Sequence, residues 1–267
     1  MLLPFLSVVM TSLAGQEEIN EAGGFVLWAA EPTLNAYRAV LSGGVVTQAM
    51  IVSIGVTAVG TAVSLLSTIG LAYGLSRPGS LGHGLMLRVT LFTLFFTPGI
   101  IPMYLLVQHL GLIDQWAALI LPVMVNAFNV IVMRSFFLDM PGELIEAAKI
   151  DGASEFATLV RIVLPLSRAV VAVVGLFYAV AYWNAFFTAL LYIQSPEKWP
   201  LSLVLRTFVV DQTPIGADEL SAGSTALPPQ TAIQTAIIAL SVIPVLVIYP
   251  FLQKHFRAGL LVGGVKG

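Results

Sequence analysis

Long apolar stretches, separated by short polar segments, make up most of the chain. Five of these stretches have about 20 residues or more, the length that an α-helix needs to cross the hydrocarbon core of a membrane. They cover residues 49–75, 85–110, 116–138, 166–193 and 231–251. The stretches lack the alternating pattern of a membrane β-barrel, and a backbone in lipid must satisfy its own hydrogen bonds. The pattern therefore predicts an all-α, polytopic membrane helical bundle.

A shorter apolar run, LLPFLSVVMTSL at residues 2–13, precedes these stretches. As a helix it would reach only about two-thirds of the way across the hydrocarbon core. The run does not resemble a signal peptide, because no basic start and no small-residue cleavage site occur before Gly15. We interpret it as the distal half of a first transmembrane helix whose start is missing. The prediction is then about six transmembrane helices, the first truncated.

The composition also indicates an integral membrane protein, with 58% hydrophobic residues, 10% charged residues and a mean hydropathy of +0.94. If alternate connections face the same side, one side collects Arg77, Arg88, Arg134, Lys149, Arg161, Arg168, Lys254, Arg257 and Lys266. The other side has only Arg38, Lys198 and Arg206. In membrane proteins the basic residues of the connections concentrate on the cytoplasmic side. The C-terminus belongs to the more basic side, so we expect it to be cytoplasmic. The chain has no cysteine, which excludes disulfides and thiolate metal sites.

A charged segment at about 139–165 interrupts the apolar pattern and predicts a helical hairpin. Residues 143–150 (ELIEAAKI) are good helix formers, with Leu144, Ala147, Ala148 and Ile150 on a partly apolar side. Asp151-Gly152 supplies a turn, and a second short helix at about 154–163 starts at Ser154 as its cap. Its apolar stripe is Phe156, Leu159, Val160 and Val163. An ordinary interhelical loop explains the same residues equally well.

The hairpin also carries a specific motif. This motif resembles the EAA signature of ABC importer permeases in residue type and spacing. It consists of Glu146-Ala147-Ala148, three further residues, Gly152, nine further residues, Ile162, one further residue and Leu164-Pro165. The similarity continues in residues 97–122, in WNAFFTALLYI at 183–193 and in AGLLVGGVKG at the C-terminus. These segments resemble carbohydrate-importer permeases of the maltose type, in the second permease position. The middle and late segments are most similar to the branch that imports oligosaccharides, some with uronic acids.

The resemblance implies a type I ABC importer permease fold, with residues 1–267 as a single transmembrane permease domain in the bacterial cytoplasmic (inner) membrane. The implied partners are a second homologous permease subunit, two cytoplasmic ATPase subunits and an extracytoplasmic sugar-binding protein. Glu146, Ala147, Ala148 and Gly152 match the family's ATPase-coupling positions. The sequence contains no G-x-x-x-x-G-K-[ST] phosphate loop. We therefore expect no cofactor on this chain and no enzymatic activity of its own, with ATP and Mg on the partner ATPase.

Polar residues inside the apolar stretches are candidates for a substrate path, because such groups are costly in a membrane. Amide and aromatic groups suit a sugar, which offers both hydroxyls and apolar C–H patches. The candidates are Asn126, Asn129, Tyr182, Trp183, Asn184 and Thr188. Hydrogen bonding between helices is the alternative role for the asparagines. In the apolar stretch at 49–75, the small residues Gly70 and Gly74 predict close helix packing rather than ligand binding.

Two segments are predicted to lie outside the membrane on the opposite side from the hairpin. The extracytoplasmic loop at about 195–230 is long for a connection, and long loops are commonly functional or disordered. In the resembling family the corresponding loop reaches the binding protein, so we expect a docking role. Residues 15–48 either make further contacts with the binding protein or form a solvated linker.

Other classes of function fit the sequence less well. His83, His109 and His255 stand apart without metal-binding spacing, and no G-x-S-x-G motif or paired intramembrane carboxylates occur. An ion-coupled secondary sugar carrier usually needs buried ionisable groups, whereas the acids here lie in loops. A non-transporting membrane scaffold is a further alternative. The expected surroundings are membrane lipid and protein partners, with no nucleic acid.

Overall fold

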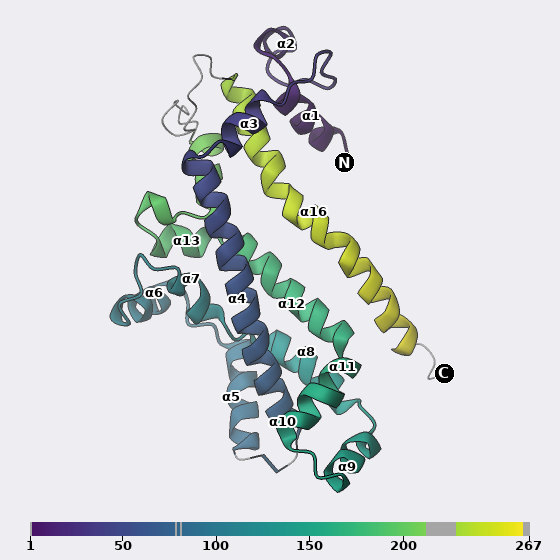
Figure 1. The fold of residues 1–267 in the computed structure, drawn as a ribbon. Helices are drawn as coiled ribbons and strands as arrows, with labels where there is room; N and C mark the ends of the chain where they lie inside the picture. The colour runs from purple at the N-terminus through teal and green to yellow at the C-terminus, as the bar shows by residue number, and fades with distance from the viewer. Residues whose placement is uncertain (1, 78, 81, 212–227, 264–267) are drawn as a thin grey trace. The chain divides into compact units, whose positions relative to one another are not determined.

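The computed structural model describes residues 2–77, 79–80, 82–211 and 228–263, with side chains for those between 3 and 247 (Figure 1). All regular elements in these residues are helices, which confirms the predicted all-α class. The chain divides into two compact units, described separately below. The first unit comprises Met1–Val56, Ile113–Trp116 and Trp183–Ile248, and the second comprises Thr57–Leu112, Ala117–Tyr182 and Tyr249–Gly267.

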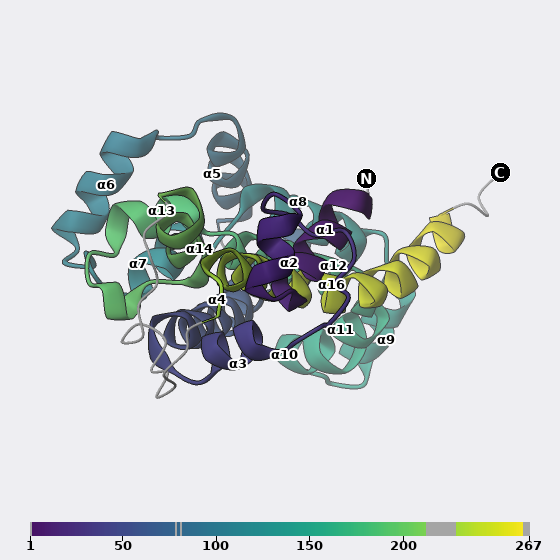
Figure 2. The same ribbon diagram turned by 90° about the horizontal axis from the view of Figure 1, so that it is seen from above.

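The first unit has a core built from short helices and the ends of two long ones. Its elements are α1 (Leu2–Leu13), α2 (Gln16–Glu21), α3 (Asn35–Leu41), the start of α4 (Gly44–Ser76), α13 (Phe186–Tyr192), a 3-10 turn (Pro196–Lys198), α14 (Leu201–Leu205), a π-helix (Arg206–Val210) and the start of α16 (Gln230–Gly263). The buried core includes Val40, Val46, Val204, Ile233 and Ile237. Helices α13 and α14 lie side by side (Figure 2). The segment 15–48 is therefore folded into this unit rather than a solvated linker.

Part of the predicted 195–230 loop is a packed helical segment. Leu201, Val204 and Phe208 are buried at helical spacing, as burial on one helix face requires. The backbone N–H of Leu201 donates to Ser53 Oγ at 2.8 Å, and Gln234 Nε2 donates to the Phe208 carbonyl at 2.7 Å. These bonds fix residues 196–210 against α4 and α16. The remaining part of the loop, 212–227, lies outside the described residues.

The second unit contains the middle of the chain. Its elements are the rest of α4, α5 (His83–Phe95), α6 (Ile100–His109), α7 (Ala117–Ile120) with a 3-10 turn (Leu121–Val123), α8 (Ala127–Leu138), α9 (Gly142–Ile150), α10 (Glu155–Thr158) with a π-helix (Leu159–Val163), α11 (Leu164–Leu166) and α12 (Arg168–Trp183). Helix α4 packs on α12 at Gly60, where an added Cβ would lie 2.8 Å from the Tyr182 ring. Close contact thus occurs at Gly60. At Gly70 and Gly74 no such contact occurs within the described part of this chain, since no atom outside the helix's own backbone lies within 4 Å of an added Cβ.

Two of the predicted spans are single helices. Gly44–Ser76 and Gln230–Val247 are long and apolar enough to cross a membrane, which agrees with the spans predicted at 49–75 and 231–251. The other three predicted spans are broken, so their prediction as uninterrupted helices was wrong. The 85–110 span divides at residues 96–99, the 116–138 span bends by 53° after Val123, and the 166–193 span divides between Trp183 and Phe186.

Local chemistry explains these breaks. Pro98 lacks a backbone N–H and disfavours helix at the preceding residue, while Gly99 has φ +80°. Pro122 lies in the 3-10 turn before the 53° bend. At the third break, the Phe186 N–H donates to the Asn184 carbonyl at 2.7 Å in a tight turn. Broken helices at membrane depth are found where the freed backbone groups are covered by protein or line a cavity.

Candidate functional site

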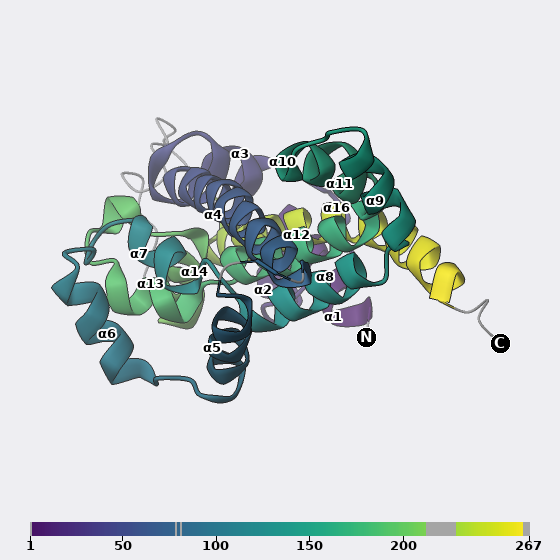
Figure 3. The ribbon, with the colours of Figure 1, turned by 90° about the horizontal axis from the view of Figure 1, so that it is seen from below.

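The motif-bearing segment folds into the predicted hairpin. Helix α9 ends at Ile150, and Gly152 adopts a left-handed conformation with φ +76° that a side chain would strain. The Gly152 N–H donates to the Lys149 carbonyl at 3.0 Å. Ser154 caps α10, because its Oγ accepts a hydrogen bond of 3.2 Å from the Ala157 N–H. The predicted turn and cap are both present, and α9, α10 and α11 form one group (Figure 3).

The hairpin buries only some of the apolar residues that the sequence places on its two helices. Ile145 and Ala148 are buried, whereas Leu144, Ala147 and Ile150 are exposed. Of the predicted second stripe, Val163 is buried and Leu159 half-buried, but Phe156 and Val160 are exposed. The change to a π-helix at Leu159–Val163 rotates the following residues away from α-helical spacing, which explains the error for that stripe.

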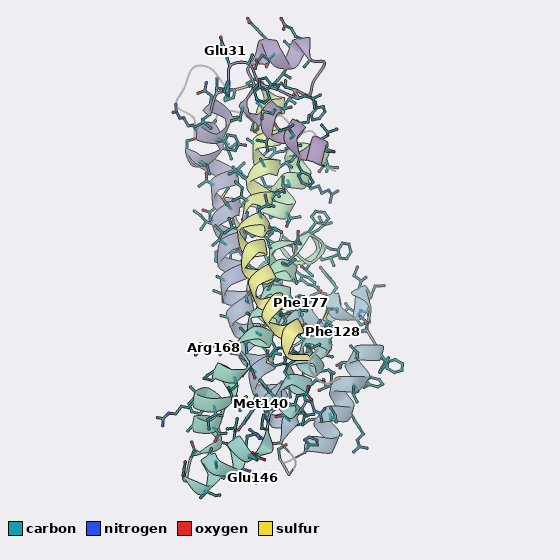
Figure 4. The ribbon with its side chains drawn as sticks, turned by 90° about the vertical axis from the view of Figure 1, so that its right-hand side faces the viewer. Glu31, Phe128, Met140, Glu146, Arg168 and Phe177 are labelled. Atoms are coloured by element: carbon teal, nitrogen blue, oxygen red, sulfur yellow. The ribbon has the colours of Figure 1, made fainter. Side chains whose placement is uncertain are left out.

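Of the three consecutive motif residues, Glu146 and Ala147 are exposed and Ala148 is buried. We call Leu144, Glu146, Ala147, Ile150 and Phe156 the hairpin surface; all five are exposed, Ile150 to 86% and Phe156 to 75%. Figure 4 shows Glu146 at the far end of the hairpin. Apolar side chains are thus exposed on a segment outside the predicted spans.

The opposite side of the hairpin is anchored to the end of α4. The Tyr73 hydroxyl donates to Glu155 Oε2 at 2.5 Å and accepts a bond of 3.2 Å from Arg77 Nη2. Glu155 also forms ion pairs with Arg77 at 3.9 Å and with Lys149 at 3.7 Å. We call Tyr73, Arg77, Lys149 and Glu155 the hairpin anchor. The Tyr73 hydroxyl bond, with the charges of Arg77 and Lys149, holds the pKa of Glu155 below its ordinary value.

Helix α8 joins the same end of α4. Arg134 Nε donates to the Leu75 carbonyl at 2.8 Å, which satisfies one of the last carbonyls of α4. The Phe137 ring packs edge-on against Tyr73, with 6.4 Å between the ring centroids. The sequence reasoning missed the anchor; the spacing of Tyr73 and Arg77, one helical turn apart, was a weak signal for it.

Three of the predicted substrate-path residues lie in the second unit. Asn126 is exposed and caps α8, with Oδ1 accepting a 3.2 Å bond from the Asn129 N–H. Asn129 is buried, and so is Tyr182, whose hydroxyl shares a 2.6 Å hydrogen bond with Ser64. The Asn126 N–H donates to the Tyr178 hydroxyl at 3.0 Å, so α8 and α12 meet there.

The other three predicted residues lie in the first unit: Trp183 and Asn184 at the break between α12 and α13, and Thr188 on α13. Trp183 Nε1 donates to the Ser241 carbonyl at 3.0 Å, which ties this break to α16. Asn184 is exposed and Thr188 is half-buried. Trp183 thus has a helix-linking contact, while Asn184 presents its side chain at a surface.

Exposed aromatic residues near Asn126 were missed by the sequence reasoning. Phe128 on α8 is 54% exposed and Phe177 on α12 is 40% exposed, and Figure 4 shows them close together. The Asn126–Tyr178 hydrogen bond places the two helices side by side at this point. No feature of the sequence distinguishes these residues, because an aromatic residue within an apolar stretch is usually buried or lipid-facing.

A polar cluster fixes the segment between α6 and α7. Asp114, with φ 62°, accepts hydrogen bonds from the Gln194 N–H at 2.9 Å, the Ser195 N–H at 2.8 Å, Ser195 Oγ at 2.6 Å and Lys198 Nζ at 2.7 Å. We call Asp114, Gln194, Ser195 and Lys198 the Asp114 clamp. These donors, the Lys198 ammonium foremost, hold the pKa of Asp114 well below its ordinary value. Among the residues whose side chains are described, no three His, Asp or Glu gather as metal ligands.

Comparisons with known proteins agree with this fold. Residues 66–262 match the family model "Binding-protein-dependent transport system inner membrane component". The chain is 43% identical to the polygalacturonan/rhamnogalacturonan transport system permease protein YtcP of Bacillus subtilis (strain 168), over 99% of this chain and 92% of that protein. It is 45% identical to protein LplC of the same organism, over 100% of this chain and 90% of LplC.

A solved structure provides a third comparison. A chain of a bacterial ABC transporter involved in the import of the acidic polysaccharide alginate superposes with a TM-score of 0.86 and 30% identity, covering 96% of this chain and 90% of that one. The similarity confirms the predicted type I ABC importer permease fold. The chain belongs to the family of binding-protein-dependent transport system inner membrane components, and is a membrane permease subunit of an ABC importer.

Proposed function

We propose that this permease subunit forms half of the pore of an importer for oligosaccharides that contain uronic acids. Two relatives support this substrate class, since YtcP is named for polygalacturonan and rhamnogalacturonan and the alginate importer carries an acidic polysaccharide. More distant relatives are named for neutral arabinooligosaccharides, at 30% identity over 80% of this chain. The higher identity to YtcP favours the acidic class.

The proposed assembly contains a second homologous permease, two ATPase subunits that bind ATP and Mg, and an extracytoplasmic sugar-binding protein. The family description supports dependence on a binding protein. The distribution of basic residues supports a cytoplasmic hairpin and C-terminus. In this orientation the hairpin surface faces the ATPases and the Asp114 clamp faces the binding protein.

Coupling to ATP hydrolysis takes place at the hairpin surface. The single observation that carries this proposal is the exposure of Ile150 and Phe156 beside Glu146 and Ala147 on a capped and anchored hairpin. An exposed apolar rim around a small residue suits a groove on a partner protein. Closure of the ATPase pair then displaces the hairpin and, with it, the membrane helices, which alternates access to the pore.

Different observations support the proposed substrate path and the proposed docking segment. Asn126 and Asn184 are exposed amides and are proposed to contact sugar, with Trp183 at the same break as Asn184 and Thr188 on α13. Asn129 and Tyr182 are buried and are proposed to hold that path in shape. The 195–230 segment is proposed to dock the binding protein, because the Asp114 clamp gives it a fixed start.

The test is ATP hydrolysis by the complete complex in lipid, with binding protein loaded with oligogalacturonide, alginate oligosaccharide, arabinooligosaccharide or maltooligosaccharide. We expect the uronic acid ligands to stimulate hydrolysis and the neutral ligands to have no effect. Stimulation by a neutral ligand alone would overturn the proposed substrate class. Uptake that needs an ion gradient and no ATP would support the secondary carrier, and a complex without any uptake would support the scaffold.

A further inference from the structure

The hairpin is joined to the membrane helices by covalent connections that contain bends. Toward α12, the chain passes through the π-helix Leu159–Val163 and then turns by 87° between Glu155–Leu166 and Arg168–Trp183. Toward α8, it passes through Pro141 immediately before α9. A π-helix and a sharp bend interrupt the regular hydrogen-bond ladder, so they transmit force less rigidly than an unbroken helix.

Helix α4 offers a straighter connection. It is one unbroken helix of 33 residues, Gly44–Ser76. It is bonded to α12 at two positions one helical turn apart, by Ser64 with Tyr182 at 2.6 Å and by Thr68 with Tyr178 at 2.7 Å. Any displacement of the end of α4 is therefore passed to α12. What α4 lacks is a covalent bond to the hairpin, from which it is separated by more than sixty residues of chain.

Glu155 supplies that missing connection. Its carboxylate accepts from Tyr73 at 2.5 Å and pairs with Arg77 at 3.9 Å, both on or directly after α4. It also pairs with Lys149 on α9 at 3.7 Å. One carboxylate thus contacts both arms of the hairpin and the end of α4. The Arg77 guanidinium lies 4.6 Å from the centre of the Tyr73 ring, which holds the two α4 side chains in place.

We propose that Glu155, Tyr73 and Arg77 form a latch that makes the hairpin and α4 move as one body. The proposal rests on the proposed coupling role of the hairpin and adds a positioning function to residues outside the hairpin surface. With the latch closed, displacement of the hairpin reaches α4 and, through it, α12. With the latch open, the bends at both ends of the hairpin absorb part of the displacement.

The exposure of Glu155 makes it possible to distinguish a role in coupling from a role in folding stability. The Glu155 side chain is 57% exposed and that of Arg77 is 17% exposed, so Glu155→Gln removes the charge, keeps an oxygen at this position and leaves Arg77 bonded to the Tyr73 hydroxyl. Exposed ion pairs contribute little to folding stability. A latch variant is therefore expected to fold, insert and assemble, and to be altered in coupling alone.

The first experiment measures sugar transported per ATP hydrolysed by the complete complex in proteoliposomes. We expect Glu155→Gln and Tyr73→Phe to lower this ratio about fivefold, the lower range for coupling between two sites. Basal ATP hydrolysis and copurification of the ATPase should stay unchanged. The matched control is Glu143→Gln, which removes a carboxylate from an exposed position on α9 that makes no ion pair with the described residues. Equal ratios for Glu155→Gln and Glu143→Gln would overturn the latch.

A rescue experiment uses the absence of cysteine from the chain. The double variant Arg77→Cys with Glu155→Cys should be uncoupled, and a short bifunctional thiol cross-linker between the two positions should restore transport per ATP. A purely structural role predicts loss of assembled complex instead, with an unchanged ratio. If cross-linking abolishes transport, the hairpin must separate from α4 during the cycle and the latch is wrong.

A distance measurement tests the latch even if the complex transports no sugar. Spin labels at Leu66 on α4 and Glu143 on α9 both occupy exposed positions of the second unit, outside the hairpin surface. We expect one narrow distance distribution in the complex, with and without ATP, and a broader one after Glu155→Gln. An equally broad distribution in the unsubstituted latch would contradict the proposal. If the complex fails to transport any sugar while the narrow distribution holds, the proposed function fails and the latch stands.

Discussion

The hydroxyls of Ser64 on α4 and Tyr182 on α12 share a hydrogen bond of 2.6 Å in the buried contact between the two helices. Tyr182→Phe removes this bond and leaves the ring in place. Interhelical hydrogen bonds in membrane proteins contribute about 0.6 kcal/mol on average and up to about 1.7 kcal/mol. We expect a loss of unfolding free energy in this range, measured by reversible unfolding in mixed micelles. In a double-mutant cycle, Ser64→Ala should cause little further loss of unfolding free energy in the Tyr182→Phe background. Fully additive losses would contradict the shared bond.

Gly60 allows α4 to approach Tyr182 closely. An added Cβ would lie 2.8 Å from the ring, so Gly60→Ala must push the helices apart. Overpacking of this kind costs about 1–3 kcal/mol. The matched control is Gly70→Ala on the same helix, where an added Cβ meets no atom within 4 Å. We expect the control to be neutral or stabilising, because alanine favours helix over glycine. Equal melting temperatures for the two variants would contradict the close contact.

Asp114→Asn tests the clamp through its pH dependence. The donors around Asp114 lower its folded-state pKa below the ordinary value of 3.8. A depressed carboxylate pKa contributes stability above the unfolded-state pKa, and this contribution is lost as the pH falls through the folded-state pKa. The difference in melting temperature between the unsubstituted chain and Asp114→Asn should therefore be constant from pH 7 to about pH 5 and shrink only below about pH 4. A difference that stays constant down to about pH 2 would show that the pKa is not lowered.

The hairpin surface can be tested with two neighbouring alanines. Ala147 is exposed, so Ala147→Trp should leave insertion and melting temperature unchanged but reduce transport per ATP by obstructing the ATPase. Ala148 is only 6% exposed, so Ala148→Trp should instead lower the melting temperature through overpacking. The two variants are compared by membrane insertion, thermal unfolding and coupled transport. Full coupling in assembled Ala147→Trp complexes would exclude this surface from the ATPase contact.

The turn of the hairpin gives a further prediction. Gly152 has φ +76°, whereas proline is restricted to a φ of about −65°. Gly152→Pro should therefore distort the hairpin, and Gly152→Ala should strain it by about 1–2 kcal/mol. Because the turn lies outside the predicted spans, both variants should still insert into the membrane. We expect coupled transport to be lost in Gly152→Pro and reduced in Gly152→Ala. Unimpaired transport in Gly152→Pro would contradict a coupling role for the hairpin.

Local chemistry made some of these features predictable from the sequence. The turn at Gly152 and the cap at Ser154 depend on residues within a few positions of each other. The long apolar helix α4 follows from composition alone. The break at Pro98 was also readable, because proline disfavours helix before it, but the apolar length of the segment outweighed that signal.

Other features depend on contacts between distant parts of the chain. Asp114 and Lys198 are 84 residues apart, and Tyr73 and Glu155 are 82 residues apart. Neither pair follows from periodicity or from a motif. The exposure of Phe156 also does not follow from the sequence, because an apolar stripe on a short helix does not show which of its residues pack within the chain.

Uptake of a labelled oligogalacturonide into proteoliposomes tests the proposed importer as a whole. The vesicles contain the complete complex, with ATP and Mg supplied on the side of the ATPases and loaded binding protein on the other side. We predict accumulation that requires both ATP and the binding protein, persists when ion gradients are collapsed, and falls in the Glu155→Gln variant. Uptake that continues without ATP or without the binding protein would contradict an ATP-coupled importer.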